Sequence, residues 1–275
     1  MTSNVKNQQQ NNSQQNNSTN EKINNITNIA AQILREILQS NNITHIDLTE
    51  EHIGLEGIKI LGKALEHNEL ITEINLCDND IGSEELSLLI KVLETNHSLI
   101  NIDIGYNNIG VQGLIILAEF LEDNKTIKQI NLTGNDINDQ GTDILAALLT
   151  NNKTIDQMNL CDNNISDKGA IILARFLENN STIKQMDLNI NNIGDVGIVQ
   201  LVKSLETNKT IGQIDLSYNN ITDNGAIKLV EILEYNNITS KIIIDFTDFD
   251  NENISYEVEE LLIKTLEQHN KKGGV

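Results

Sequence analysis

The chain has 275 residues and carries 40 acidic against 19 basic side chains, a formal net charge of −21. A field this negative repels nucleic-acid phosphates and anionic membrane surfaces, so neither is expected as a partner, whereas a basic protein surface would be attracted. Only 3% of the residues are aromatic, and proline and tryptophan do not occur. The core must therefore consist of isoleucine and leucine, and the turns must depend on glycine and asparagine.

The N-terminal segment differs in composition from everything that follows. Twelve of its first twenty residues are Asn or Gln and almost none is apolar, so burial could not offset the entropy lost on ordering. Residues 1–21 are therefore predicted to be a disordered tail. The segment lacks the cationic and apolar parts of a secretory signal, and no apolar run in the chain approaches a membrane span. A cytoplasmic location is expected.

Residues 22–41 are predicted to form a helix. Their later part places apolar side chains on one helical stripe, namely Ile33, Leu34, Ile37 and Leu38. A stripe of this kind could cover the open end of a repeat array, which needs a cap at each end.

A unit of 28 residues then recurs without insertions. Ile or Met stands at each of the following positions: 46, 74, 102, 130, 158, 186, 214 and 242. Leu or Ile follows two residues later in every copy, and this alternation is typical of a short strand with one buried face. Asn stands three residues further on in six consecutive copies, at 79, 107, 135, 163, 191 and 219.

The second half of each unit predicts a helix. Leucines lie four residues apart, as Leu117 and Leu121 do, and form one apolar stripe. A glycine precedes the stripe in most copies. An Asn follows the last leucine by three residues, and we expect it to end the helix in the left-handed conformation. These residues are Asn68, Asn96, Asn124, Asn152, Asn180 and Asn208. Each unit is therefore predicted to form a strand, a turn, a helix and a second turn.

This pattern, L-x-x-L-x-L-x-x-N-x-I, resembles a leucine-rich repeat, and its 28-residue form is similar to ribonuclease inhibitor, the Ran GTPase-activating protein and the C-terminal repeats of NOD-like receptors. The resemblance implies about eight repeats over residues 42–250, with the Asn column bonded to backbone groups of the turns. Strands lie about 4.8 Å apart, whereas packed helices need roughly 8–10 Å. The expected fold is thus an α/β solenoid, a horseshoe with a concave parallel sheet, outer helices and a capping helix at both ends.

The pattern changes near the C-terminus. Thr247 stands where Asn is expected, and Phe249 stands in the place of Ile. A final helix is predicted at about 254–269, with Val258, Leu262 and Leu266 on its apolar stripe. Residues 251–275 are therefore assigned to a C-terminal capping helix and a frayed tail.

No catalytic motif of the serine hydrolase, P-loop or zinc protease type occurs in the sequence. Cys77 and Cys161 occupy the same position three repeats apart, roughly 14 Å at strand spacing, so no disulfide is expected between them. Residues 136–141 resemble the start of a calcium loop, but Ala147 stands where a bidentate Glu is required. We therefore expect no enzyme activity, cofactor, metal or small-molecule substrate.

The residues that vary among the repeats predict where a partner binds. Side chains between the buried strand positions face the concave surface, and they are mostly acids and amides. Aromatic or aliphatic residues follow three positions later in some repeats. Tyr is enriched among interface anchors, and acidic side chains favour a Lys/Arg patch. The candidate binding residues are Asp103, Tyr106, Asp187, Ile190, Asp215 and Tyr218.

The sequence thus predicts a protein–protein interaction module whose concave face binds a partner with a basic patch. The alternative is a GTPase-activating protein of the Ran-regulator type, which the resemblance suggests. GTPase-activating proteins often supply an arginine to the GTPase, although the Ran regulator is not known for relying on one. The arginines of this chain are Arg35, in the expected N-terminal cap, and Arg175, in a repeat helix. No motif carries a catalytic role from that family to either residue.

Overall fold

The computed structural model describes residues 42–235, 238–244 and 254–273. The predicted tail (1–21), the predicted N-terminal capping helix (22–41) with Arg35, and the substituted positions Thr247 and Phe249 lie outside the described residues.

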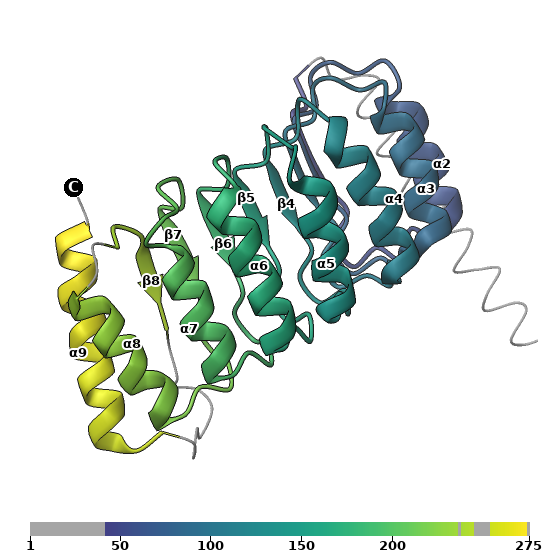
Figure 1. Ribbon diagram of the computed structural model, residues 1–275. Coiled ribbons are helices and arrows are strands. Elements are labelled where there is room, and N and C mark those ends of the chain that lie inside the picture. Colours follow the sequence, from purple (N-terminus) through teal and green to yellow (C-terminus); the bar gives the residue numbers. More distant parts are fainter. Residues whose placement is uncertain (1–41, 236–237, 245–253, 274–275) are drawn as a thin grey trace, which may run out of the picture.

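The described chain alternates three-residue strands with helices (Figure 1). The strands are β1 (His45–Asp47), β2 (Glu73–Asn75), β3 (Asn101–Asp103), β4 (Gln129–Asn131), β5 (Gln157–Asn159), β6 (Gln185–Asp187), β7 (Gln213–Asp215) and β8 (Lys241–Ile243). The helices are α2 (Gly54–Leu65), α3 (Ser83–Leu93), α4 (Gly110–Asp123), α5 (Asn138–Leu149), α6 (Asp167–Asn179), α7 (Asp195–Ser204), α8 (Asp223–Tyr235) and α9 (Tyr256–Gly273). We number each repeat by its strand, from repeat 1 to repeat 8.

All the strands join one parallel sheet in the order β1 to β8. Neighbouring strands pair at an offset of one repeat, so that His45 lies opposite Glu73 and Asp187 opposite Asp215. The helices form one layer over one face of the sheet, and each packs against the next (Figure 1). The predicted α/β solenoid of parallel strands and outer helices is confirmed.

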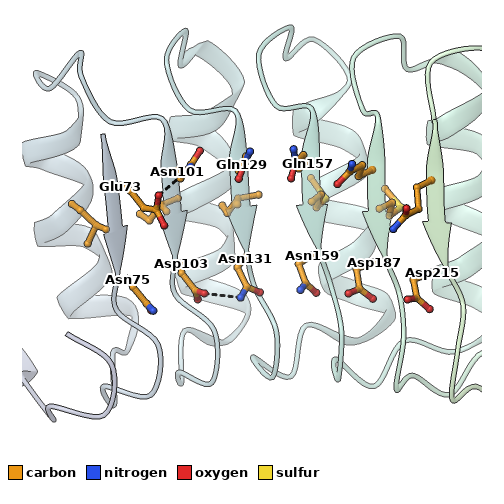
Figure 2. A pocket seen from close by; sticks show the side chains of 17 residues that line it. Glu73, Asn75, Asn101, Asp103, Gln129, Asn131, Gln157, Asn159, Asp187 and Asp215 are labelled. Carbon is orange, nitrogen blue, oxygen red and sulfur yellow. Dashed lines mark hydrogen bonds between the residues drawn. The ribbon is translucent and has the colours of Figure 1, made fainter. Parts of the chain in front are cut away.

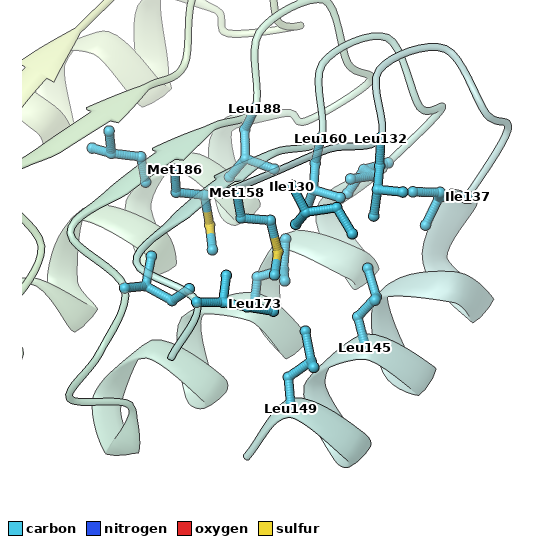
Figure 3. Close-up of a cluster of buried hydrophobic side chains, with 14 of the residues drawn as sticks. Ile130, Leu132, Ile137, Leu145, Leu149, Met158, Leu160, Leu173, Met186 and Leu188 are labelled. Carbon is cyan, nitrogen blue, oxygen red and sulfur yellow. The ribbon is translucent and has the colours of Figure 1, made fainter. Parts of the chain in front are cut away.

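The core lies between the sheet and the helix layer. The middle residue of every strand is apolar and buried, as Met158 and Met186 are. These side chains meet the helix leucines, including Leu145, Leu149 and Leu173 (Figure 3). The alternation of the strand therefore sends one side chain into the core and leaves its two neighbours on the opposite face.

The predicted asparagine column bonds backbone groups, as expected. The Nδ2 of Asn163 donates to the Leu132 carbonyl oxygen of the preceding repeat at 2.9 Å. Its Oδ1 accepts from the backbone N–H groups of Asn135 (3.0 Å) and Ile137 (3.2 Å). One amide thus satisfies buried donors and acceptors that water cannot reach, which ties each repeat to the one before it.

The prediction of left-handed asparagines at the helix ends is wrong. Asn124 has φ −65° and ψ 137°, and Asn180 has φ −78° and ψ 136°, which is extended backbone. The side chain instead organises the following turn: the Oδ1 of Asn180 accepts from the N–H groups of Thr182 (2.9 Å) and Ile183 (2.8 Å). This local bonding by Asn replaces the left-handed cap.

A third set of contacts explains some of the glycines that precede the helix leucines. Asp139, at the start of α5, reaches the next repeat, where its Oδ1 accepts from the N–H groups of Ser166 and Gly169, both at 2.9 Å. A Cβ atom on Gly169 would lie 2.6 Å from that oxygen. Burial raises the pKa of Asp139, but hydrogen bonds from Ser166 and Gly169 outweigh it and hold the pKa below its usual value. Asp167 makes the same contacts one repeat later, with Gly194 and Gly197.

At the C-terminal end, α9 packs against α8 and β8. The amide of Asn270 pairs with the edge of β8: its Oδ1 accepts from the Ile242 N–H at 3.0 Å, and its Nδ2 donates to the Ile242 carbonyl at 2.8 Å. The buried ring of His269 donates through Nε2 to the Ser240 carbonyl at 2.9 Å. These contacts cover strand groups that an open sheet edge would expose.

Candidate functional site

The face of the sheet turned away from the helices holds a groove with a volume of about 330 Å³ that runs from β2 to β7 (Figure 2). Its floor is formed by the strand backbones, and two rows of polar side chains stand along it. The first row, at the start of the strands, is Glu73, Asn101, Gln129, Gln157, Gln185 and Gln213. The second row, at the end of the strands, is Asn75, Asp103, Asn131, Asn159, Asp187 and Asp215.

The second row has a structural role that the sequence analysis missed. The Oδ1 of each of its side chains accepts the N–H of the residue two positions later, as in Asp187 with Asn189 (3.0 Å) and Asp215 with Ser217 (3.0 Å). Asn75 and Asn159 make the same bond with neutral amides. Asp and Asn are suited to this turn because their short side chain places an oxygen beside the backbone. The turn therefore requires a side-chain oxygen at this position, but it does not require a negative charge.

The charge of the groove is uneven along its length. Among the described residues that line it, four are acidic and none is basic. The Oδ2 of Asp103 accepts a hydrogen bond from Asn131 Nδ2 at 2.7 Å, drawn as a dashed line in Figure 2. Asp187 and Asp215 instead lie opposite each other in register. Repeats 6 and 7 thus place two carboxylates side by side.

The pKa of Asp187 reflects this arrangement. Burial raises it most, a hydrogen bond from the Asn189 N–H lowers it, and the carboxylate of Asp215 raises it further, so that the pKa lies above its usual value. The charged form of Asp187 is therefore disfavoured in the fold, and a cation brought into the groove would relieve that cost.

The first row was not selected from the sequence as a binding site. Its glutamines occupy four successive strands in register, from Gln129 to Gln213. At its N-terminal end, Glu73 Oε2 lies 3.2 Å from His45 Nε2 and 3.4 Å from Asn101 Nδ2. The signal was the same strand alternation that identified the second row, because both rows flank the buried strand position.

Three of the predicted binding residues lie outside the groove lining. Tyr106, Ile190 and Tyr218 follow the strand ends, in a column that we call the rim: Glu50, Asp78, Tyr106, Gly134, Asp162, Ile190 and Tyr218. Every member has a positive φ, between 48° at Tyr106 and 65° at Gly134. The N–H of Ile190, for example, donates to the Ser217 carbonyl of the next repeat at 3.1 Å. This ladder of backbone bonds sets the left-handed conformation of the rim.

The rim side chains differ in their surroundings. Tyr106 is 50% exposed, and its ring lies over the backbone of Gly134, where a Cβ atom would be 2.7 Å from the Tyr106 Cε1. Ile190 is 41% exposed, and Tyr218 is half-buried. Gly134 is thus the rim position that needs glycine, both for its φ and for the ring above it.

The remaining candidate groups lie apart from the groove or are chemically quiet. Cys77 and Cys161 are both free cysteines. Burial, followed by Asp187 and other nearby carboxylates, raises the pKa of Cys161 to about 12, so its thiol stays protonated at neutral pH. No group of three His, Cys, Asp or Glu side chains suited to a metal ion occurs within the described ranges. Arg175 is exposed on α6, in the helix layer.

No helix in the described part of the chain is long and apolar enough to span a membrane.

A family model described as "Leucine Rich repeat" matches residues 95–118, 123–142, 179–202 and 207–230. No curated protein sequence matches the chain.

Several solved structures are similar. The tropomodulin C-terminal domain of Caenorhabditis elegans shares 18% identity over 59% of this chain and 95% of its own, with a TM-score of 0.44. Actin-binding site 2 of leiomodin-1 shares 16% identity over 72% of this chain and 91% of its own, with a TM-score of 0.39. The leucine-rich repeat-containing protein LegL7 of Legionella pneumophila shares 15% identity over 86% of this chain and 94% of its own, with a TM-score of 0.44.

The four segments matched by the family model each contain a strand and the start or body of its helix, and the structure repeats this unit in register from β1 to α8. The asparagine ladder, the apolar strand positions and the 28-residue offset between paired strands all belong to the same unit. These four segments therefore match leucine-rich repeats, and the described part of the chain has the fold of a leucine-rich repeat solenoid.

Proposed function

We propose that this chain is a protein-interaction module whose groove, across β2 to β7, binds a partner protein through a patch of Lys and Arg side chains. The partner would contact the two polar rows, and the rim would form one edge of the interface. Binding rather than catalysis is the role that this arrangement favours, because the groove offers hydrogen-bonding groups and charge with no nucleophile and base held together among its described lining residues.

The observation that carries the proposal is the charge of the second row. Asn75, Asn131 and Asn159 show that an amide serves the turn, yet Asp stands at 103, 187 and 215. At Asp187 the charged form is disfavoured by burial and by Asp215. A charge that costs stability and is not needed for the fold is typical of a functional surface.

The backbone of the groove also supports the proposal. Each strand is bonded to both neighbours, and the asparagine ladder fixes the turns at the strand ends. A partner that docks on such a surface orders few additional groups, so little conformational entropy is lost on binding.

The test is affinity capture with the full chain and two charge-matched variants. The groove variant carries Asp103→Asn, Asp187→Asn and Asp215→Asn, which retain the turn acceptors. The control variant carries Glu94→Gln, Glu119→Gln and Asp123→Asn, three exposed carboxylates at the ends of α3 and α4. Proteins that bind wild type and the control, but not the groove variant, would support the proposal. Equal capture by all three chains, or equal loss from both variants, would contradict it.

The same capture separates the GTPase-activating alternative. If the captured partner is a GTPase, its rate of GTP hydrolysis is measured with and without the chain. Acceleration by catalytic amounts of the chain would favour that alternative, whereas stable binding at an unchanged rate would favour the interaction module.

A further inference from the structure

Repeats 6 and 7 bring two different pairs of side chains to the same end of the groove. Asp187 and Asp215 are paired across β6 and β7, about 4.8 Å apart at the usual strand spacing. Ile190 and Tyr218 follow them on the rim, three residues later in each repeat. An acidic pair on the groove floor therefore stands next to an apolar pair on the rim, and we call these residues the composite patch.

The carboxylates of the composite patch retain accepting capacity. The Oδ1 of each is bound by a turn N–H, from Asn189 and Ser217. A carboxylate has further lone pairs on its second oxygen. A guanidinium or ammonium group placed between the two would bond both second oxygens and lower their repulsion.

Repeat 3 contains the same residue types in a different setting. Asp103 is bound by the Asn131 amide at 2.7 Å, so its second oxygen already has a donor. The ring of Tyr106 lies over Gly134, and its rim neighbours are Asp78 and Gly134 rather than apolar side chains. Repeat 3 therefore offers neither a paired charge nor a paired apolar surface.

The rim conformation adds a second contrast. Ile190 has φ 51° although it is β-branched, and a β-branched side chain in the left-handed region is a conformational outlier that strains the backbone. Asp, Glu and Gly fill the other rim positions of repeats 1, 2, 4 and 5. The turn therefore does not require an apolar side chain at the rim position.

We infer that the composite patch is the main anchor for the partner, and that it recognises a segment in which Lys or Arg stands two or three residues from a large apolar side chain. The inference rests on the proposed function. In each repeat, three residues separate the carboxylate from the rim side chain, and an extended partner segment covers about 7–10 Å in two or three residues. The basic side chain then reaches the carboxylate pair while the apolar one packs against Ile190 and Tyr218.

The probe is a random twelve-residue peptide library displayed on phage and selected on the full chain. Three double variants are compared with wild type: Asp187→Asn with Ile190→Asn, Asp215→Asn with Tyr218→Asn, and the matched control Asp103→Asn with Tyr106→Asn. Asn keeps the turn acceptor in the second row, and on the rim it tolerates a positive φ. Circular dichroism verifies that each variant is folded.

The inference expects selected peptides to be enriched in a basic and an apolar residue at this spacing. Their affinity should fall at least about tenfold in the repeat 6 and repeat 7 variants, and by a clearly smaller factor in the repeat 3 variant, whose Asp103 also lines the groove. Equal losses in all three variants, or peptides without the basic–apolar pair, would overturn the inference while leaving binding in the groove intact. If no variant weakens peptide binding, or if no peptide is selected, the inference is overturned. Peptide binding that no variant weakens would also count against the groove as the binding site.

Discussion

The aspartates that end β3, β6 and β7 combine a structural bond with a charge, and a substitution by Asn separates the two. The carbonyl oxygen of Asn accepts the turn N–H as the carboxylate oxygen does, and Asn131 demonstrates this with Thr133 at 3.0 Å. A change caused by Asp187→Asn therefore reports on charge, whereas Asp103→Asn also loses the hydrogen bond from Asn131. Asp187 is the most informative position because burial and Asp215 both act on it.

We expect Asp187→Asn to stabilise the chain at pH 7. The pKa of Asp187 is raised in the fold, so the protonated form contributes stability that is present below the unfolded pKa and is lost as pH rises through the folded pKa. The variant should gain up to about 1 kcal/mol in urea unfolding at pH 7, and the gain should disappear at pH 3, where Asp187 is protonated. Asp103→Asn, whose carboxylate is bound by Asn131, is the control and should show no such gain. A variant less stable than wild type at pH 7 would contradict this account of the charge.

We also expect Ile190→Asn to raise the free energy of unfolding by about 1 kcal/mol, because Asn adopts a positive φ with less strain than a β-branched residue. The measurement is again urea unfolding. The control is Ile190→Ala, because alanine removes the branched side chain but keeps the Cβ atom that disfavours a positive φ. If Ile190→Asn lowers the stability by that amount, packing of the Ile190 side chain outweighs the backbone strain.

At the scale of the repeat elements, much of the structure could be predicted from the sequence. Strict recurrence of buried positions such as Met158 identified the strands, and the leucines four residues apart identified the helices. The left-handed caps were wrong because the side chain of Asn180 bonds the following turn instead. The positive φ of Tyr106 and Ile190 had no sequence signal, since bonds to the next repeat impose it.

The site was predicted less completely than the fold. Charge and aromaticity drew attention to Asp187 and Asp215, which do line the groove. They gave no reason to select Gln129 or Gln157, because an amide in a repeating column looks the same whether it faces a groove or open solvent. Charge and aromaticity also gave no sign that the second-row side chains accept a hydrogen bond from the N–H of the residue two positions later.

The contact between Asp139 and Gly169 makes a prediction at the element scale. Replacing a helical glycine by alanine ordinarily stabilises a helix by up to about 1 kcal/mol. In α6 the added Cβ would lie 2.6 Å from Asp139 Oδ1 and 2.8 Å from Ile165 Cγ2. We therefore expect Gly169→Ala to lower the free energy of unfolding by about 1–3 kcal/mol. The control is Gly212→Ala, whose Cβ would meet only the Lys184 carbonyl, at 3.6 Å. If Gly169→Ala instead stabilises the chain, the Asp139 side chain moves away from the added Cβ atom at little cost, which would contradict this prediction.

At the scale of the whole molecule, the stacked repeats place the two polar rows on the face of the sheet turned away from the helices. The net charge of −21 favours encounter with basic partners at low ionic strength, and this long-range effect is screened within about 8 Å at physiological salt. In the proposed interface, short-range specificity would come from the groove itself. The two polar rows, the rim and the composite patch are all placed by strands whose register is the same in every repeat.

The most direct test of the central claim is carboxylate footprinting of the chain, free and bound to a partner obtained by capture. Exposed Asp and Glu side chains are modified with a carbodiimide and glycine ester, and the modification of each residue is followed by mass spectrometry. We predict that Asp187 and Asp215 lose most of their labelling in the complex, while Glu94 and Asp123 at the ends of α3 and α4 keep theirs. Protection of Glu94 and Asp123 with unchanged labelling of Asp187 and Asp215 would place the partner outside the groove and contradict the claim.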